Sequence, residues 1–358
     1  DRHDPRAHEL GADSLGSRTR RAKLSSEVQP DADIVGYAFL GRFGPAPLTL
    51  STRLCMTPQE FARLEDYAEA IVRKLQLPPC PDILASMGRE LAREHPDVQR
   101  IAVEASKDVS SSATLLKTVN SAWYGLANKA RSVHQAIAYL GLERTSLLMA
   151  GLLLRNVFPS TRRQAMASFW EASTQLSLTL AFYANVLGRA DRDEMHTFGL
   201  FRDAGSAVLI QRFEDYDPAA IAADGHFGPS LTELEQARYG TDHAVIGAVL
   251  ARDWALPETM CEAILWHHAD FVLDMEARPI ADPAVEMVAL GVLGDRAIER
   301  YRGVAQTEAS NHVLDAALRT LALDARRHAD FENEALALLR GIAGQPQPTL
   351  RLASLTLH

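Results

Sequence analysis

The chain has 358 residues, which is enough for one large or two medium domains with well-buried cores. Its 37 Lys and Arg residues are outnumbered by 46 Asp and Glu residues, so the net charge is -9. That charge opposes a nonspecific grip on a phosphate backbone, and we do not expect nucleic acid as a partner.

The cysteines and the apolar segments indicate in which cell compartment the protein is expected. Cys55, Cys80 and Cys261 are odd in number and lack a C-x-x-C spacing, so neither a disulfide framework nor a zinc knuckle is indicated. The longest strongly apolar run, Leu147–Leu154, is too short to span a bilayer, and the polar start of the chain does not resemble a secretory signal. We therefore expect a cytoplasmic protein without membrane contact.

Residues 1–56 are predicted to form an N-terminal extension that begins with a disordered, solvated tail. A basic cluster lies in this tail at Arg18, Arg20, Arg21 and Lys23. Contact of this cluster with nucleic acid or a membrane surface is the alternative to a solvated tail. Alternating residues over 34–43 and 48–54 predict two short strands, and 349–357 has similar stretches. A small sheet formed by both chain ends is thus an open alternative.

The rest of the chain is predicted to be helical. Thr57-Pro58-Gln59-Glu60 is a capping box that opens a helix to about Lys74, and Pro81 can begin the next one. Gly125 and Gly141 are expected to end segments with positive φ. The further helices are predicted at 97–106, 111–122, 132–140, 142–156, 163–188, 193–213, 230–239, 242–254, 257–270, 283–302, 308–323 and 328–341.

Two neighbouring segments carry a family resemblance. Leu115–Gly125 reads Leu-Leu-Lys-Thr-Val-Asn-Ser-Ala-Trp-Tyr-Gly, and Ser132–Leu142 reads Ser-Val-His-Gln-Ala-Ile-Ala-Tyr-Leu-Gly-Leu. They resemble the signature of the bacterial HDOD family, the HD-related output domain. The resemblance implies an all-α, multi-helix bundle in two helical halves, and it implies signalling by a domain whose phosphohydrolase-like metal site has decayed.

This resemblance also suggests a domain organisation. We expect an HDOD-like domain at 57–275, with a signature half at 77–157 and a degenerate HD-like half at 163–275. C-terminal helices and an extended tail would follow at 276–358. Family members sit with receiver, diguanylate cyclase or phosphodiesterase partners. The 76 residues before the motif are too few for an ordinary receiver, so we expect the partner to be a separate signalling protein.

HD-type phosphohydrolases hold one or two metals with a His, an adjacent His-Asp pair, further His residues and a late Asp. The counterparts implied here are damaged. Ala172 in Phe-Trp-Glu-Ala-Ser replaces the first ligand, and Arg202 in Gly-Leu-Phe-Arg-Asp replaces the central His. The late Asp aligns with Val292. A permanent cation at Arg202 opposes binding of a dication, so we expect no metal and no cofactor.

Four candidate ligands survive, and each has a simpler interpretation. Asp203 can pair with Arg202, and His243 can be a buried helical His bonded to a backbone carbonyl. Neighbours on a helix point about 100° apart, so we expect that His267 and His268 do not face one site together and that only one is buried. This vestigial pocket could still hold a small anion or a nucleotide, with Arg202 as the phosphate partner.

The signature residues themselves favour a structural role. Asn120 and Ser121 can satisfy backbone groups, Trp123 and Tyr124 can anchor apolar bodies, and Gly125 can turn the chain. No His, Cys or acidic residue accompanies Ser121 to activate it as a nucleophile. The sequence thus predicts a non-enzymatic regulatory module that acts through protein contacts. A residual phosphohydrolase acting on a nucleotide or cyclic dinucleotide, and a nucleotide-binding sensor without turnover, are the alternatives.

Overall fold

The computed structural model describes residues 75–121, 124–158, 162–218, 221, 230–273 and 280–342. The chain divides into two compact units, Asp1–Gly44 and Pro45–His358, and every described residue belongs to the second. The described residues form helices and connecting loops and contain no strand, so the predicted all-α fold is confirmed.

The helices in the signature half are α3 (Asp82–Leu91), α4 (Val98–Ala105), α5 (Val109–Val119), α6 (Val133–Leu140), α7 (Leu142–Leu154) and the short η2 (Arg155–Val157). Those that follow are α8 (Arg163–Leu187), α9 (Arg192–Phe201), α10 (Ala204–Arg212), α12 (Leu231–Tyr239), α13 (His243–Asp253), α14 (Glu258–Trp266), η4 (Asp270–Leu273), α15 (Asp282–Arg302), α16 (Glu308–Thr320) and α17 (Ala325–Ile342).

Several helices begin directly after a residue whose side chain caps the helix. The side chains of Ser132 and Asp242 accept hydrogen bonds from the backbone three residues on, and Ser230 forms a full capping box with Glu233. Gly125 and Gly141 adopt φ values of 56° and 85°, as predicted. Gly141 lies between α6 and α7, and the chain bends by 120° from one helix to the next.

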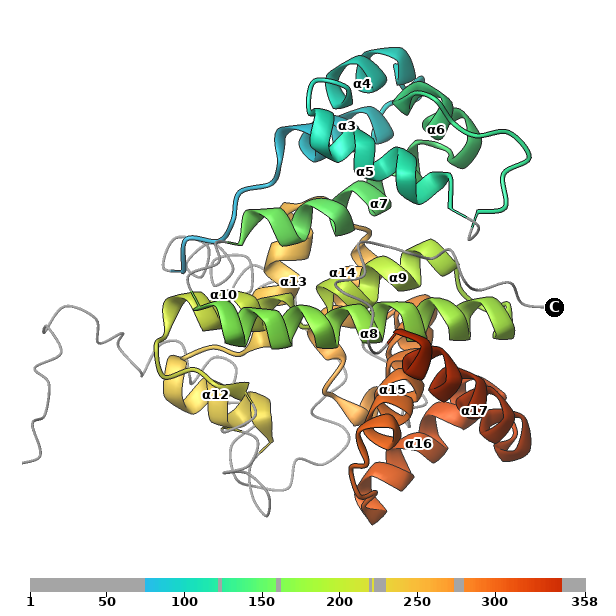
Figure 1. The fold of residues 1–358 in the computed structure, drawn as a ribbon. Coiled ribbons are helices and arrows are strands. Elements are labelled where there is room, and N and C mark those ends of the chain that lie inside the picture. The colour runs from blue at the N-terminus through green and yellow to red at the C-terminus, as the bar shows by residue number, and fades with distance from the viewer. Residues whose placement is uncertain are drawn as a thin grey trace, which may run out of the picture. The chain divides into compact units, whose positions relative to one another are not determined.

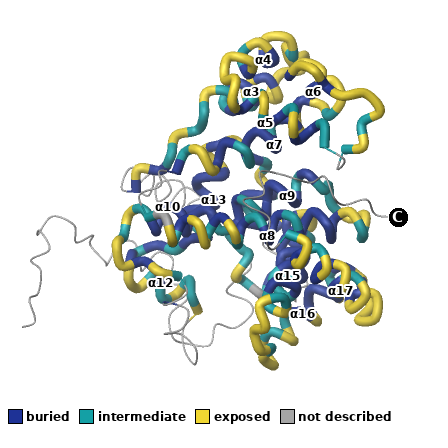
Figure 2. Tube along the Cα trace, in the orientation of Figure 1, coloured by how far each residue is buried: buried dark blue, intermediate teal, exposed yellow. Residues whose placement is uncertain are grey.

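Helix α7 connects the signature half to the rest of the fold (Figure 1). It packs against α3, α5 and α6 on one side and against α9 on the other. The long helix α8 runs beside α9, and α15 packs on α8 and α14 and carries α16 and α17. The tube in Figure 2 is buried mainly along α8, α9, α10, α13 and α15, so the core is deepest where these helices meet.

Two of the differences between the predicted and the observed helices fall at the candidate site. The helix predicted at 193–213 is interrupted after Phe201, and α10 begins at Ala204. At this break Gly205 lies against α13, where an added Cβ would lie 2.0 Å from the carbonyl oxygen of His243. The helix predicted at 257–270 ends at Trp266. The first break coincides with this close approach of two helices, which local periodicity in the sequence does not indicate.

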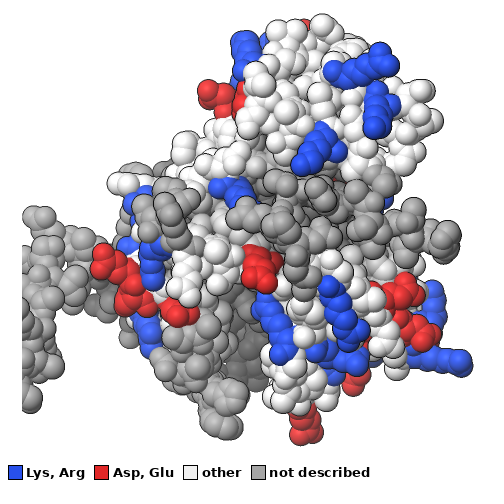
Figure 3. Space-filling model, in the orientation of Figure 1, with Lys and Arg blue, Asp and Glu red and all other residues white. Residues whose placement is uncertain are grey.

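Charged side chains are distributed unevenly over the surface in Figure 3. Lys and Arg side chains are scattered over the part built by α3 to α7, and they are separated by uncharged surface. Among the residues described on this face, they form no continuous basic stripe of the kind that follows a nucleic-acid backbone.

Several sequence predictions concern other parts of the chain. The strands at 34–43, 48–54 and 349–357 and the helix at 57–74 lie outside the described residues. The domain boundaries at 57 and 275 stay predictions. Across the described part of the chain, no single helix has the length and hydropathy to cross a bilayer; the pair α6 and α7–η2, bent by 120°, meets that test only when taken together.

Candidate functional site

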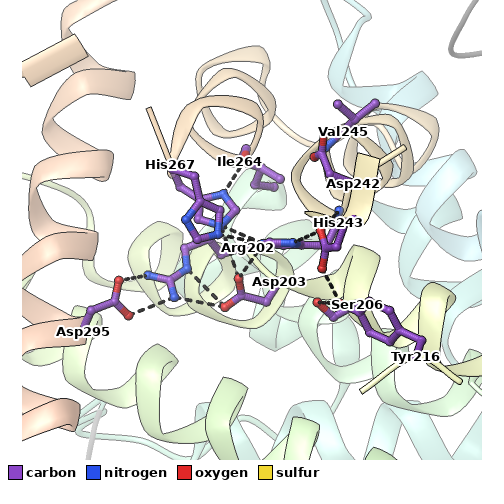
Figure 4. Close-up of polar contacts among 12 residues, drawn as sticks. Arg202, Asp203, Ser206, Tyr216, Asp242, His243, Val245, Ile264, His267 and Asp295 are labelled. Carbon is purple, nitrogen blue, oxygen red and sulfur yellow. Dashed lines mark hydrogen bonds and ion pairs between the residues drawn. The ribbon is translucent and has the colours of Figure 1, made fainter. Parts of the chain in front are cut away.

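The residues of the predicted vestigial pocket meet where several helices begin or end (Figure 4). Arg202 and Asp203 occupy the break between α9 and α10, and His243 is the first residue of α13. His267 and His268 follow the last turn of α14. These five residues, up to 66 positions apart in the sequence, thus face one point because four helix ends converge there.

Arg202 forms the centre of a charged network on one side of the site. Its Nη1 and Nη2 atoms donate to the two carboxylate oxygens of Asp295 at 2.8 and 2.9 Å. Its Nε and Nη2 atoms also donate to Oδ2 of Asp203 at 3.2 and 3.0 Å. Arg202 is only 8% exposed, so two carboxylates engage a guanidinium that has little access to water. This geometry confirms the predicted ion pair of Arg202 with Asp203.

Asp203 separates this guanidinium from a cluster of three imidazoles. While Oδ2 faces Arg202, Oδ1 lies 3.3 Å from Nε2 of His267 and 3.6 Å from Nε2 of His243. The Nε2 atom of His243 lies 3.3 Å from that of His267 and 2.9 Å from that of His268. One ligand atom from each of these four residues lies within 4.8 Å of the others.

The expectation that His267 and His268 do not share a site is wrong. Both rings reach His243, although His268 is exposed and the side chain of His267 is only 4% exposed. Both histidines follow the last helical residue of α14, Trp266, and His267 is the C-cap residue. The expected difference in burial is correct, but it does not separate the two rings.

His243 also departs from its simplest interpretation. Its Nδ1 atom lies 2.7 Å from Oε2 of Glu235, and its backbone N–H donates to the same oxygen at 2.9 Å. The expected backbone carbonyl is therefore replaced by a carboxylate from α12. Oε1 of Glu235 accepts a hydrogen bond of 2.6 Å from the hydroxyl of Tyr216, which also lies 3.1 Å from Ser206 Oγ. Glu235 is fully buried and is satisfied at both oxygens.

These outer contacts determine the tautomers of two rings. The carboxylate of Glu235 can only accept, so Nδ1 of His243 carries the hydrogen. Nδ1 of His267 lies 2.6 Å from the carbonyl oxygen of Ile264 and carries a hydrogen for the same reason. In their neutral forms both imidazoles consequently direct a bare Nε2 lone pair inward, which is the arrangement that prepares a histidine to bind a metal ion.

The electrostatics keep the carboxylates charged. Burial alone would raise the pKa of Asp203, but Arg202 and His267 hold it well below its ordinary value. Burial would likewise raise the pKa of Glu235, and the hydrogen bond with His243 lowers it instead. For His267, burial lowers the pKa more than Asp203 raises it. Burial would also lower the pKa of His243, but the hydrogen bond with Glu235 raises it. Because metal ions bind neutral imidazoles, an ion would compete with a proton at this ring.

Ala172 on α8 and Val292 on α15, which stand at predicted ligand positions, are half-buried and offer no ligand atom. Two other residues, Asp295 and Glu235, complete the site, and the sequence analysis did not identify them. The carboxylate that α15 brings to Arg202 is that of Asp295, three residues after Val292 and thus nearly one helical turn away. This spacing could have suggested Asp295 as the alternative alignment. Glu235 has no local signal, because only the tertiary fold brings α12 to His243.

The signature segment lies apart from these ligands. The side-chain amide of Asn120 pairs with both the N–H and the carbonyl of Ala130, each at 2.7 Å. The Tyr124 hydroxyl donates to Asp193 on α9 at 3.0 Å, and Arg192 lies over the Tyr124 ring. Ser121 Oγ is buried without a hydrogen-bond partner among the described residues. Trp123 lies outside them, so its role as an anchor stays a prediction.

Comparisons with known proteins agree on the fold. Residues 77–270 match the HDOD domain family. A protein of Shewanella amazonensis SB2B, provisionally named a phosphohydrolase, aligns with a TM-score of 0.54 at 19% identity over 76% of this chain and 98% of its own. A protein of Marinobacter aquaeolei VT8, provisionally named a signal transduction protein, aligns with a TM-score of 0.55 at 18% identity over 78% of this chain and 63% of its own.

A curated relative is similar over part of its length. An uncharacterized protein of Treponema pallidum (strain Nichols) is 27% identical over 201 residues, which cover 54% of this chain and 37% of that protein. The chain therefore spans little more than a third of this relative.

Proposed function

The chain belongs to the HDOD domain family, and we propose that it is a cytoplasmic signalling or regulatory module that does not hydrolyse phosphoesters. One observation carries the proposal. Arg202 stands in the centre of the HD-like site and engages both Asp203 and Asp295. A fixed organic cation thus neutralises the two carboxylates that a catalytic metal pair would require.

The chemistry of a guanidinium explains why this substitution matters. Metal-dependent hydrolysis needs an ion with an open coordination position, at which a water molecule loses its proton near neutral pH. Arginine has no such position and remains protonated throughout the usual pH range. The surrounding carboxylates raise the pKa of Arg202 further, against the effect of burial. Arg202 can therefore hold Asp203 and Asp295 in place but cannot activate water.

A module without turnover would act through contacts with other proteins. Receiver proteins and cyclic-dinucleotide enzymes are the partners that HDOD domains accompany, and we propose a separate protein of this kind as the partner. The provisional name of the Marinobacter protein, a signal transduction protein, supports the same context. The link from Tyr124 to Asp193 ties the signature segment to α9, which ends at Arg202, and so supplies a direct connection between the two halves.

A residual phosphohydrolase is the second candidate. The cluster of Asp203, His243, His267 and His268 favours it, as does the provisional name of the Shewanella protein. A nucleotide sensor that uses Arg202 as its phosphate partner has less support. The Nε, Nη1 and Nη2 atoms of Arg202 already donate to carboxylates, and a phosphate would have to displace Asp203 or Asp295.

Turnover assays on wild type and Arg202→Ala test the proposal. Both proteins are incubated with a generic phosphodiester, nucleotides and cyclic dinucleotides, with added Mn²⁺, Fe²⁺ or Zn²⁺. We expect no turnover above buffer for either protein. Arg202→Ala should also lower the free energy of unfolding by about 2–3 kcal/mol, because it leaves two carboxylates facing each other; the partial exposure of Asp295 keeps this cost moderate.

Turnover by the wild type that disappears in Arg202→Ala, with the circular dichroism spectrum unchanged, would contradict the proposal and make Arg202 a substrate clamp. Wild-type turnover that survives in Arg202→Ala would contradict it as well, and would place the chemistry on the imidazole cluster.

A further inference from the structure

The Nε2 atoms at the centre of the imidazole cluster present lone pairs to one another and need a proton or a cation between them. The hydrogens on Nδ1 of His243 and His267 are engaged by Glu235 and Ile264, so both Nε2 atoms present lone pairs only 3.3 Å apart. Nε2 of His267 also faces Oδ1 of Asp203 at 3.3 Å. Acceptors at such distances repel one another unless a proton or a cation lies among them.

The spacing of these atoms is that of ligands around one metal ion. Two nitrogen or oxygen ligands about 2.0–2.2 Å from an ion, at ordinary coordination angles, lie about 3–3.6 Å from each other. The separations between Nε2 of His243 and its three neighbours are 2.9, 3.3 and 3.6 Å. The donors therefore need little rearrangement to surround an ion.

The charges in the network point to a dication. Arg202 contributes one positive charge, and Asp203, Glu235 and Asp295 contribute three negative charges, which leaves a net charge of two negative units when the imidazoles are neutral. A single divalent ion would balance this charge. Three imidazoles and one carboxylate suit zinc, iron, cobalt and their neighbours, whereas magnesium and calcium prefer oxygen ligands.

Arg202 limits the site to one ion. Oδ2 of Asp203 and both carboxylate oxygens of Asp295 already accept hydrogen bonds from the guanidinium. Figure 4 shows Asp203 between Arg202 on one side and His243 on the other. The oxygens that a second ion would need are thus occupied by a permanent cation, while Oδ1 of Asp203 remains directed at the imidazoles.

We propose that Asp203, His243, His267 and His268 bind one divalent transition-metal ion per chain, and that Arg202 takes the place of a second ion. Glu235 acts as a positioning residue that fixes the His243 ring through Nδ1. With four protein ligands, the ion would join the ends of α10, α13 and α14 and stabilise their arrangement. The proposal goes beyond the proposed function, because it applies whether or not the module turns over a substrate.

Titration of untagged, chelator-treated protein with Co²⁺ tests the proposal. The visible absorption of bound Co²⁺ reports nitrogen ligation, and competition with Zn²⁺ gives the relative affinity. We expect saturation at one equivalent and an increase in melting temperature with either ion. His268→Ala should weaken binding at least about 10-fold and remove most of the thermal shift. The His268 side chain is at the surface, so this variant should fold.

Two comparison variants separate ligation from general effects. His134→Ala removes an exposed histidine on α6, away from the cluster, and should bind Co²⁺ like the wild type. Glu235→Gln should keep a stoichiometry of one but weaken binding about 10- to 100-fold, because the amide is a poorer partner for Nδ1 of His243.

The absence of saturable Co²⁺ binding, saturation at two equivalents, or wild-type affinity in His268→Ala would each overturn the proposal. The first result would mean that a proton among the imidazoles, and not a metal ion, satisfies Asp203. These outcomes are independent of phosphoester turnover, so a failure of this proposal is distinguishable from a failure of the proposed function.

Discussion

At the residue scale, two fully buried tyrosines differ in the hydrogen bonds that their hydroxyl groups make. The Tyr216 hydroxyl donates to Glu235 and lies beside Ser206, whereas the Tyr183 hydroxyl has no hydrogen-bond partner among the described residues. A bond to a buried carboxylate contributes about 1.5–3 kcal/mol, and an unpaired buried hydroxyl contributes nothing favourable. The two residues therefore form a matched pair for measuring the support given to Glu235.

We predict that Tyr216→Phe lowers the free energy of unfolding by about 1.5–3 kcal/mol, while Tyr183→Phe leaves it unchanged or raises it slightly. Urea denaturation of both variants measures the difference. Equal losses would mean that the ring environment, and not the bond to Glu235, determines the cost of removing the hydroxyl.

His196 provides a pH prediction. This residue is 7% exposed, and burial, assisted by Arg192, lowers its pKa to about 4. In the unfolded chain its pKa is about 6.5, so the unfolded state binds the proton more readily as pH falls below 7. Stability is therefore lost on acidification through this range, by about 1.4 kcal/mol at pH 5.5 relative to pH 8 from this residue alone.

His196→Gln removes the titrating group and leaves the other histidines in place. We predict that the loss of unfolding free energy between pH 8 and pH 5.5 is about 1.4 kcal/mol smaller in His196→Gln than in the wild type. If denaturation at the two pH values gave the same loss for both proteins, His196 would have to be accessible to protons in the folded state.

At the element scale, the site depends on a close crossing of α10 and α13. Gly205 lies so near α13 that an added Cβ would lie 2.0 Å from the His243 carbonyl oxygen, and the clash is with backbone that cannot rotate away. Because Asp203 and His243 flank this crossing, any displacement of α10 also separates two of the proposed ligands. The crossing thus couples packing to site geometry.

Gly205→Ala should accordingly cost about 3 kcal/mol or more and weaken Co²⁺ binding, since α10 must shift. The control is Gly341→Ala on α17, where a new Cβ meets no described residue within 4 Å and alanine favours the helix. Thermal melts and Co²⁺ titrations of both variants measure the two effects. Wild-type stability in Gly205→Ala would show that the helices are farther apart than described.

The signature loop offers a second element-scale prediction. The amide of Asn120 closes the loop to Ala130 with two hydrogen bonds, whereas Ser121 Oγ has no partner among the described residues. We predict that Asn120→Ala lowers the free energy of unfolding by about 1–3 kcal/mol, and that Ser121→Ala is nearly neutral. Equal effects in chemical denaturation would remove the argument that Asn120 organises this segment.

The same elements indicate how far sequence reasoning reaches. The caps at Ser132, Ser230 and Asp242 could be predicted, because a cap is a local interaction between residues three positions apart. The interruption at Arg202 and Asp203 could not, since the residues on both sides keep helical spacing and the close contact of Gly205 with α13 is a tertiary feature. Sequence periodicity and capping residues locate helices well. They do not locate breaks that occur where helices cross.

At the scale of the whole molecule, the sequence predicted the all-α fold and the family, and it identified every surviving ligand of the cluster. It did not predict that His267 and His268 both reach His243. It also missed Glu235 and Asp295, which reach the site only through the packing of α12 and α15. A charged residue that reaches a site from a different helix leaves no recognisable pattern in the sequence around the site.

The number of ions bound per chain tests the central claim, that Arg202 occupies the place of a metal ion, most directly. Elemental analysis of wild-type protein after equilibrium dialysis against excess Zn²⁺, followed by removal of free ion, gives this number. The arrangement of Arg202 with Asp203 and Asp295 predicts one ion per chain. Two ions per chain would mean that the guanidinium gives way to a complete metal pair, and would contradict the account.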